Sequence, residues 1–171
     1  MTIKKILTEP NKLLRQASGP VEKVGHYERE LMKDMLETMY HSNGIGLAAI
    51  QIGVPKRIIV LDIGKDENKN PMYFVNPIIK KKNQEKTTYE EGCLSVPNQF
   101  AEIDRPSKCE VEYLDFYGDK KILKAEGLLA TCIQHEMDHL EGILFIDYLS
   151  KLKKSMIIKK LSKKKTDRIV V

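Results

Sequence analysis

The sequence predicts one α+β domain in which antiparallel β-strands pack around a central helix, with a helix near the N-terminus and a basic helix at the C-terminus. Two observations predict this fold class. Residues 28–42 and 126–142 show helical hydrophobic periodicity, and four β-rich runs lie between them. The chain has 171 residues, 42% of them hydrophobic, which suits a single domain with its own core.

The helix predicted near the N-terminus covers "ERELMKDMLETMYHS" and ends at Asn43-Gly44. Its apolar stripe consists of Leu31, Met32, Met35, Leu36 and Met39. The following run from Gly44 to Ala49 has little side-chain bulk, which suits a backbone that approaches a ligand closely. It lacks the glycine spacing and the lysine of a phosphate-binding loop, so it does not predict nucleotide binding. Gln51, taken alone, is better explained as a solvated residue.

The four β-rich runs are separated by glycine, Asn-Pro and charged turns. They cover residues 57–64, 72–81, 108–118 and 120–127. The last two are predicted to form a hairpin about Tyr117-Gly118-Asp119. Connections this short favour antiparallel pairing.

The central helix contains "QHEMDHL" and is predicted to end at Gly142. Four residues are about one helical turn, so His135 and His139 leave the same face and can hold one metal ion. Glu136 lies beside the pair, where it can act as a general base. A surface helix that happens to carry these polar residues is the alternative. The histidines, however, continue an apolar stripe of Leu128, Thr131, Cys132, His135 and His139.

A catalytic metal site usually has a third protein ligand. Cys132 lies about 7.5 Å along the helix axis from the midpoint of the histidine pair, beyond the reach of a cysteine. Cys109 alternates with charged residues as in a half-buried strand, so we expect a small apolar residue there. Cys93, in "EEGCLSVP", is the favoured ligand because glycine and proline permit an unusual backbone around it. Glu141 and Asp147 stay open as weaker alternatives.

The basic charge is concentrated at the C-terminus. The net charge is +5, but residues 150–171 hold nine Lys or Arg against Asp167 alone. We expect a catalytic part over residues 1–149 and a basic extension of the same domain over 150–171, helical to about Lys163 and packed through Leu149, Leu152 and Met156. No apolar run is long enough to span a membrane, and "MTIKKILTEP" does not resemble a signal peptide. We therefore expect a cytoplasmic protein with reduced thiols.

Three stretches resemble, in this order, the signature motifs of the peptide deformylase family: "GIGLAAIQ" (Gly44 to Gln51), "EGCLS" (Glu91 to Ser95) and "HEMDH" (His135 to His139). The similarity extends from Ile6 to Leu149 and matches the bacterial form with a helical C-terminal extension. It implies the same α+β architecture. It also implies hydrolysis of the formyl group from the N-terminal formylmethionine of new proteins, with release of formate.

The resemblance also implies roles for individual residues. The metal ligands would be Cys93, His135 and His139. Glu136 would be the general base, and the Leu94 backbone N–H and the Gln51 side-chain amide would stabilise charge on the formyl oxygen. Glu91 and Arg105 match a charged pair that braces the cysteine loop. The residues implied for peptide binding are Ile45, Gly46, Gly92, Leu128, Thr131 and Cys132.

The implied cofactor is one divalent metal ion. We expect Fe²⁺ in the cell, with Zn²⁺, Ni²⁺ or Co²⁺ in purified protein. The expected partners are N-formylmethionyl nascent peptides and, through the basic C-terminal segment, the ribosome. We expect a monomer without a membrane partner. Asn98 and Phe100 depart from the family pattern, which leaves one peptide contact open.

Two other functions agree with parts of the sequence. A generic zinc peptidase would share the H-E-x-x-H pattern, but residues 140–152 offer no histidine or cysteine as a downstream third ligand. A non-enzymatic, metal-stabilised RNA-binding module would use the basic tail and have a closed site with four protein ligands.

Overall fold

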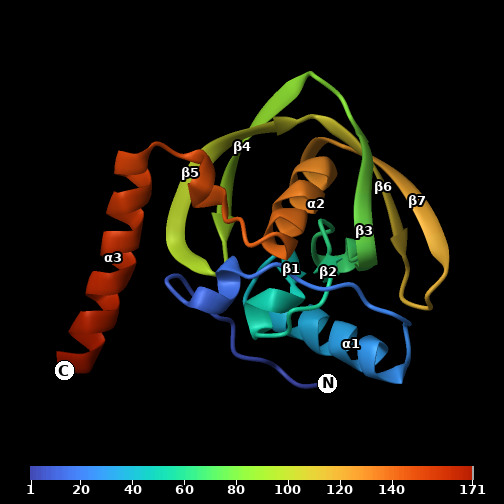
Figure 1. The fold of residues 1–171 in the computed structure, drawn as a ribbon, viewed down its shortest axis with the longest axis horizontal. Coiled ribbons are helices and arrows are strands. Elements are labelled where there is room, and N and C mark those ends of the chain that lie inside the picture. Colours follow the sequence, from blue (N-terminus) through green and yellow to red (C-terminus); the bar gives the residue numbers. More distant parts are fainter. Residues whose placement is uncertain (171) are drawn as a thin grey trace.

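The computed structural model describes the backbone of residues 1–170 and the side chains of residues 1–163. The helices are α1 (His26–His41), α2 (Gly127–Leu140) and α3 (Lys151–Val170). The strands are β1 (Gly46–Ala48), β2 (Ile58–Leu61), β3 (Met72–Lys82), β4 (Lys86–Cys93), β5 (Val96–Pro106), β6 (Lys108–Leu114) and β7 (Lys120–Glu126). An antiparallel sheet in the order β1-β2-β3-β6-β7 and the β4–β5 hairpin enclose α2, with α1 and α3 outside (Figure 1). This arrangement confirms the α+β prediction. No described helix has the length and apolar composition needed to cross a membrane.

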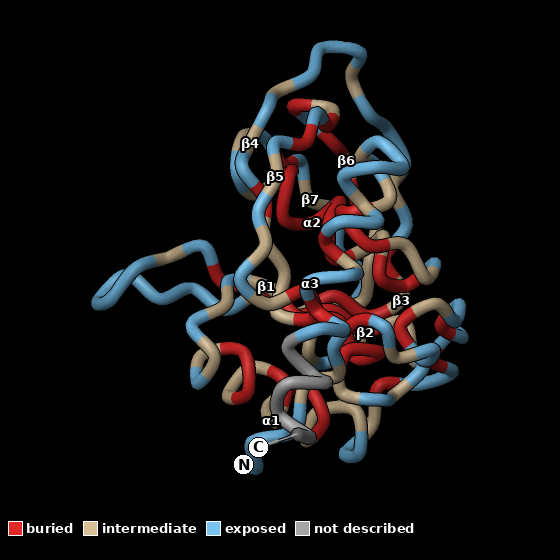
Figure 2. The backbone as a smooth tube through the Cα atoms, turned by 90° about the vertical axis from the view of Figure 1, so that its left-hand side faces the viewer, coloured by how far each residue is buried: buried red, intermediate tan, exposed pale blue. Residues whose placement is uncertain are grey.

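Strand β2 lies between the two halves of the core. Ile58 and Val60 pack with α1, whereas Ile59 and Leu61 pack with the α2 side, because alternate residues of a strand face opposite ways. The apolar stripe predicted for α1 is confirmed: Leu31, Met32, Met35 and Met39 are buried, and Leu36 is partly buried against the same cluster. Figure 2 shows the buried segments gathered around β2 and α2.

The predicted hairpin at Tyr117-Gly118-Asp119 is confirmed as the β6–β7 turn. Asp115 Oδ1 accepts hydrogen bonds from the N–H groups of Tyr117 and Asp119, which fixes the turn. The predicted stop of the central helix is also confirmed. Helix α2 ends at Leu140, and Gly142 follows with φ 71°, a left-handed backbone conformation that glycine adopts readily.

The β4–β5 hairpin is absent from the sequence prediction, which treated the surroundings of Cys93 as a loop. Strand β4 is largely polar, "KTTYEEGC", and β5 begins and ends near proline, so neither reads as a buried strand. Pairing nevertheless runs from Lys86↔Pro106 to Gly92↔Phe100 and, after a shift in register, includes Cys93↔Val96. Cys93 therefore lies at the end of a strand.

Helix α3 differs from the prediction in its length and its buried face. It continues beyond Lys163 to Val170. Of the three residues predicted to pack against the body, Leu149 is partly buried there, but Leu152 and Met156 are 72% and 51% exposed. Ile157 and Leu161 are buried against the body instead. Leu152 and Met156 are four residues apart, and so are Ile157 and Leu161. The spacing alone therefore could not show which pair faces the body. The side chains of Lys164, Lys165 and Arg168, which belong to the predicted basic tail, lie outside the described part.

Candidate functional site

The side chains of Cys93, His135 and His139 meet between β4 and α2. Their potential ligand atoms all lie within 4.8 Å of one another, and Cys93 Sγ is 3.4 Å from His139 Nε2. Both histidines leave the same face of α2 because they are one turn apart. The register of β4 and β5 shifts between Gly92 and Cys93, an irregularity of the kind that redirects a side chain.

This cluster fits a divalent transition-metal ion. Typical metal–sulfur and metal–nitrogen bonds in a tetrahedral site separate the two ligand atoms by about 3.5 Å, close to the 3.4 Å between Cys93 Sγ and His139 Nε2. His135 Nδ1 contacts Glu91, which leaves its Nε2 free to act as a ligand. One thiolate and two imidazoles are a donor set that Zn²⁺ and Fe²⁺ accept.

Glu91 and Arg105 form a buried brace behind the cluster. Glu91 Oε1 is 2.8 Å from His135 Nδ1, and Arg105 donates two hydrogen bonds to the same carboxylate, at 2.7 and 3.0 Å. Arg105 also donates to Asp138 at 2.9 Å. Burial alone would raise the pKa of Glu91, but the hydrogen bonds from His135 and Arg105 outweigh it and lower that pKa.

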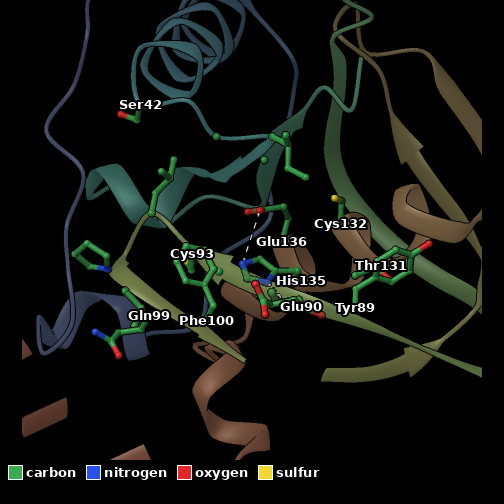
Figure 3. A pocket seen from close by; sticks show the side chains of 18 of the residues that line it. Ser42, Tyr89, Glu90, Cys93, Gln99, Phe100, Thr131, Cys132, His135 and Glu136 are labelled. Carbon is green, nitrogen blue, oxygen red and sulfur yellow. Dashed lines mark hydrogen bonds and ion pairs between the residues drawn. The ribbon is translucent and has the colours of Figure 1, made fainter. Parts of the chain in front are cut away.

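Glu136 is buried beside the cluster with a carboxylate oxygen that has no hydrogen-bond partner among the described residues. The Glu136 Oε1 atom is 4.0 Å from His135 Nε2. Figure 3 shows the Glu136 side chain pointing into the cleft. Burial raises the pKa of Glu136 to about 7. A Cβ on Gly46 would overlap the Glu136 carboxylate, so β1 comes this close only because residue 46 is glycine.

Gln51 is buried at the cluster, so the interpretation of a solvated glutamine is wrong. Its Oε1 accepts a hydrogen bond from the Ala48 N–H at 2.9 Å. Its Nε2 donates to Ser95 Oγ at 3.0 Å and lies 3.6 Å from Cys93 Sγ. Sequence reasoning assigned no role to Ser95, because a serine after Cys-Leu looks like an ordinary turn residue. Leu94, between Cys93 and Ser95, lines the same cleft.

A cleft of about 490 Å³ opens onto the cluster. It is bordered by β1, β4, the start of β5 and α2 (Figure 3). Asn98 and Phe100 also line it, and the Phe100 ring lies over Gly92, where an added Cβ would come within 2.6 Å of the ring. All the residues expected to bind peptide line the cleft: Ile45, Gly46, Gly92, Leu128, Thr131 and Cys132.

The other residues considered as ligands lie elsewhere. Cys132 is a wall of the cleft, and burial raises the pKa of its thiol to about 12. Cys109 is buried in the sheet, as expected of a small apolar residue. Glu141 pairs with Arg57 at 2.6 Å. Asp147 forms ion pairs with Arg15 and Lys154 away from the cluster, so neither carboxylate joins it.

An antiparallel α+β fold with a Cys-His-His cluster, an adjacent buried glutamate and an open cleft defines a metal-dependent hydrolase. The family model described as polypeptide deformylase matches residues 3–155. The chain belongs to the peptide deformylase family. It is a metal-dependent enzyme that removes N-formyl groups from nascent peptides.

The individual relatives agree with this assignment. A peptide deformylase of Pelagibacter ubique (strain HTCC1062) is 75% identical over the full length of both chains. The crystal structure of peptide deformylase from Ehrlichia chaffeensis is 43% identical with a TM-score of 0.94, covering 98% of this chain and 99% of that one. A second structure of that enzyme, in complex with actinonin, is 46% identical with a TM-score of 0.91, covering 96% and 98%. These matches exclude the generic peptidase and the non-enzymatic RNA-binding module.

Proposed function

We propose that Cys93, His135 and His139 hold one divalent metal ion and that Glu136 is the general base of deformylation. When bound, the ion supplies Lewis-acid chemistry and lowers the pKa of water. The close approach of the three donor atoms supports the ligand set. The single observation that carries the catalytic role is a carboxylate oxygen of Glu136 that is buried beside that set and has no hydrogen-bond partner in the described part of the chain.

The chain's own residues would act in sequence. Glu136 takes a proton from water, whose oxygen adds to the formyl carbon. The Gln51 amide and the Leu94 backbone N–H stabilise the negative charge that develops on the formyl oxygen. The formyl carbon–nitrogen bond then breaks as Glu136 passes its proton to the leaving nitrogen. The products are formate and a free N-terminal amine.

The peptide would bind as an added strand in the cleft. Among the described strands, β1 pairs only with β2 and β4 only with β5, so each has an unpaired edge for a peptide backbone. Ile45 and Gly46 come from one edge and Gly92 from the other. Leu128, Thr131 and Cys132 on α2 form the methionine pocket. Glu91 and Arg105 keep His135 oriented.

Three further assignments complete this proposal. The resident ion is Fe²⁺, since a thiolate and two imidazoles suit it. The enzyme works as a cytoplasmic monomer. Residues 1–149 carry the chemistry, and the basic residues of 150–171 bring it to the ribosome, where new N-termini emerge.

The chemistry is tested by formate release from formyl-Met-Ala-Ser, using protein purified without oxygen and with its metal content measured. We expect turnover that follows iron content and falls on exposure to air. Protein that contains metal but releases no formate would contradict the proposed function.

The ribosome assignment is tested by co-sedimentation at low and high salt, with the full chain and with a chain ending at Leu149. Binding to RNA phosphates weakens as salt rises, so the full chain should bind only at low salt. The shorter chain should bind weakly at both concentrations. Equal binding by the two chains would rule the extension out as the docking segment.

A further inference from the structure

A second groove lies outside the active-site cleft, between β5 and α3. It encloses about 490 Å³. On one side are Gln99 and Phe100 of β5, and on the other are Lys153, Met156 and Lys160 of α3. The buried contacts of Ile157 and Leu161 with Val96 and Ile103 hold α3 against the body beside the groove.

The groove adjoins the active-site cleft. Gln99 and Phe100 line both cavities. In Figure 3 Gln99 lies at the end of the cleft away from Thr131 and Cys132, and Phe100 lies near Cys93, between Gln99 and those two residues. A peptide with its methionine in the pocket beside Thr131 and Cys132 can therefore leave the cleft past Phe100 and enter the groove.

The chemistry of the groove suits an extended peptide with apolar and acidic side chains. The Phe100 ring and the Met156 side chain are 64% and 51% exposed and offer apolar contact. Lys153 and Lys160 share a face of α3 with Met156, and neither amine has an ion pair among the described residues. Of the residues whose side chains the structure describes, Glu102 at the border is the only acidic one that lines this groove.

We propose that this groove is an extended substrate subsite, which binds the nascent chain downstream of the formylmethionine and favours acidic and apolar residues. The inference rests on the proposed function, because it assumes that the formylated end lies in the cleft. Each residue of an extended peptide spans about 3.3 Å. About three residues of the bound peptide are therefore needed to pass over β5 and its side chains on the way from the cleft to the groove. Residues from about the fourth to the eighth would then occupy the groove. The apolar contacts favour a peptide over RNA.

The test compares three substrates: formyl-Met-Ala-Ser, the same tripeptide extended by Leu-Glu-Leu-Glu-Leu, and the extended peptide with both glutamates replaced by lysine. We expect kcat/KM to be roughly tenfold higher for the acidic extension than for the tripeptide, from two lysine–carboxylate pairs. The increase should come from KM and weaken at high salt. The lysine-containing peptide should not show this increase in kcat/KM.

The variant Lys153→Glu/Lys160→Glu should abolish the preference for the acidic extension and favour the lysine-containing peptide. The matched control is Lys151→Glu/Lys159→Glu, which makes the same charge change on exposed α3 residues outside both cavities. It should keep the acidic preference.

Equal kcat/KM for the tripeptide and its acidic extension would overturn the subsite, as would equal effects of the two double variants. It would also be overturned if Lys153→Glu/Lys160→Glu weakened binding of an RNA oligonucleotide, or self-association, and left the peptide preference intact. These outcomes all presuppose tripeptide turnover. Its absence would instead count against the proposed function.

Discussion

Two buried glutamates near the cluster of Cys93, His135 and His139 differ in their partners and therefore in their chemistry. Glu91 is held by His135 and Arg105, and these hydrogen bonds lower its pKa despite burial. Glu136 has one oxygen without a partner among the described residues, and burial raises its pKa to about 7. Glu91 is therefore suited to orient His135 as a fixed negative charge, whereas Glu136 can exchange a proton.

The ligand set is tested by two cysteine variants. Cys93→Ala removes a potential donor atom from the cluster, so metal affinity should fall by more than the 10- to 100-fold typical of losing an outer partner. Cys132→Ala removes only a wall of the cleft and should keep the metal. Measuring the metal content of both variant proteins shows which cysteine is the ligand. Metal retained by the Cys93 variant and lost by the Cys132 variant would reverse the assignment.

At the level of elements, the sequence predicted what local patterns determine. Helices α1 and α2 and the β6–β7 hairpin each have a clear period or turn signal, and each was predicted. The β4–β5 hairpin was not, because its polar strands are defined by pairing with each other and not by a buried apolar face. The buried face of α3 was also predicted wrongly, since only the docked helix shows that Ile157, not Leu152, faces the body.

Helix α3 is fastened to the body through Asp147. This carboxylate is 2.7 Å from Lys154 Nζ and 2.6 Å from Arg15. Burial would raise the pKa of Asp147, but the hydrogen bonds from Lys154 and Arg15 outweigh it and lower that pKa. Its contribution to stability is therefore present above the unfolded-state pKa of about 3.9 and is lost as the pH falls through the lower folded-state pKa.

We predict that Asp147→Asn lowers the free energy of unfolding by about 1 kcal/mol at pH 7. The difference from the unsubstituted protein should shrink as the pH falls below about 4, because Asp147 becomes protonated first in the unfolded state and then, at lower pH, in the folded state. Denaturant unfolding at several pH values measures this. Glu67→Gln is the control, because Glu67 is exposed and has no ion pair among the described residues. A pH-independent loss in the Asp147 variant would contradict the ion-pair explanation.

At the scale of the whole molecule, the fold joins segments that are distant in the sequence. Residues 44–51, 91–95 and 135–139 come from β1 and the turn after it, the end of β4, and α2, and they meet in the cleft (Figure 3). Sequence reasoning identified these stretches from residue types and from the family resemblance. It could not supply their contacts, such as that between Gln51 and Ser95, because those depend on how the sheet and the hairpin close around α2.

The central claim is that Glu136 moves the proton at a metal site built by other residues. Glu136→Gln keeps the size of the side chain and removes its ability to act as a base. Metal content and formate release from formyl-Met-Ala-Ser should be measured on the same sample. We predict unchanged metal content and turnover reduced by about 10²- to 10⁴-fold. Turnover at the unsubstituted rate by the metal-loaded variant would contradict the mechanism.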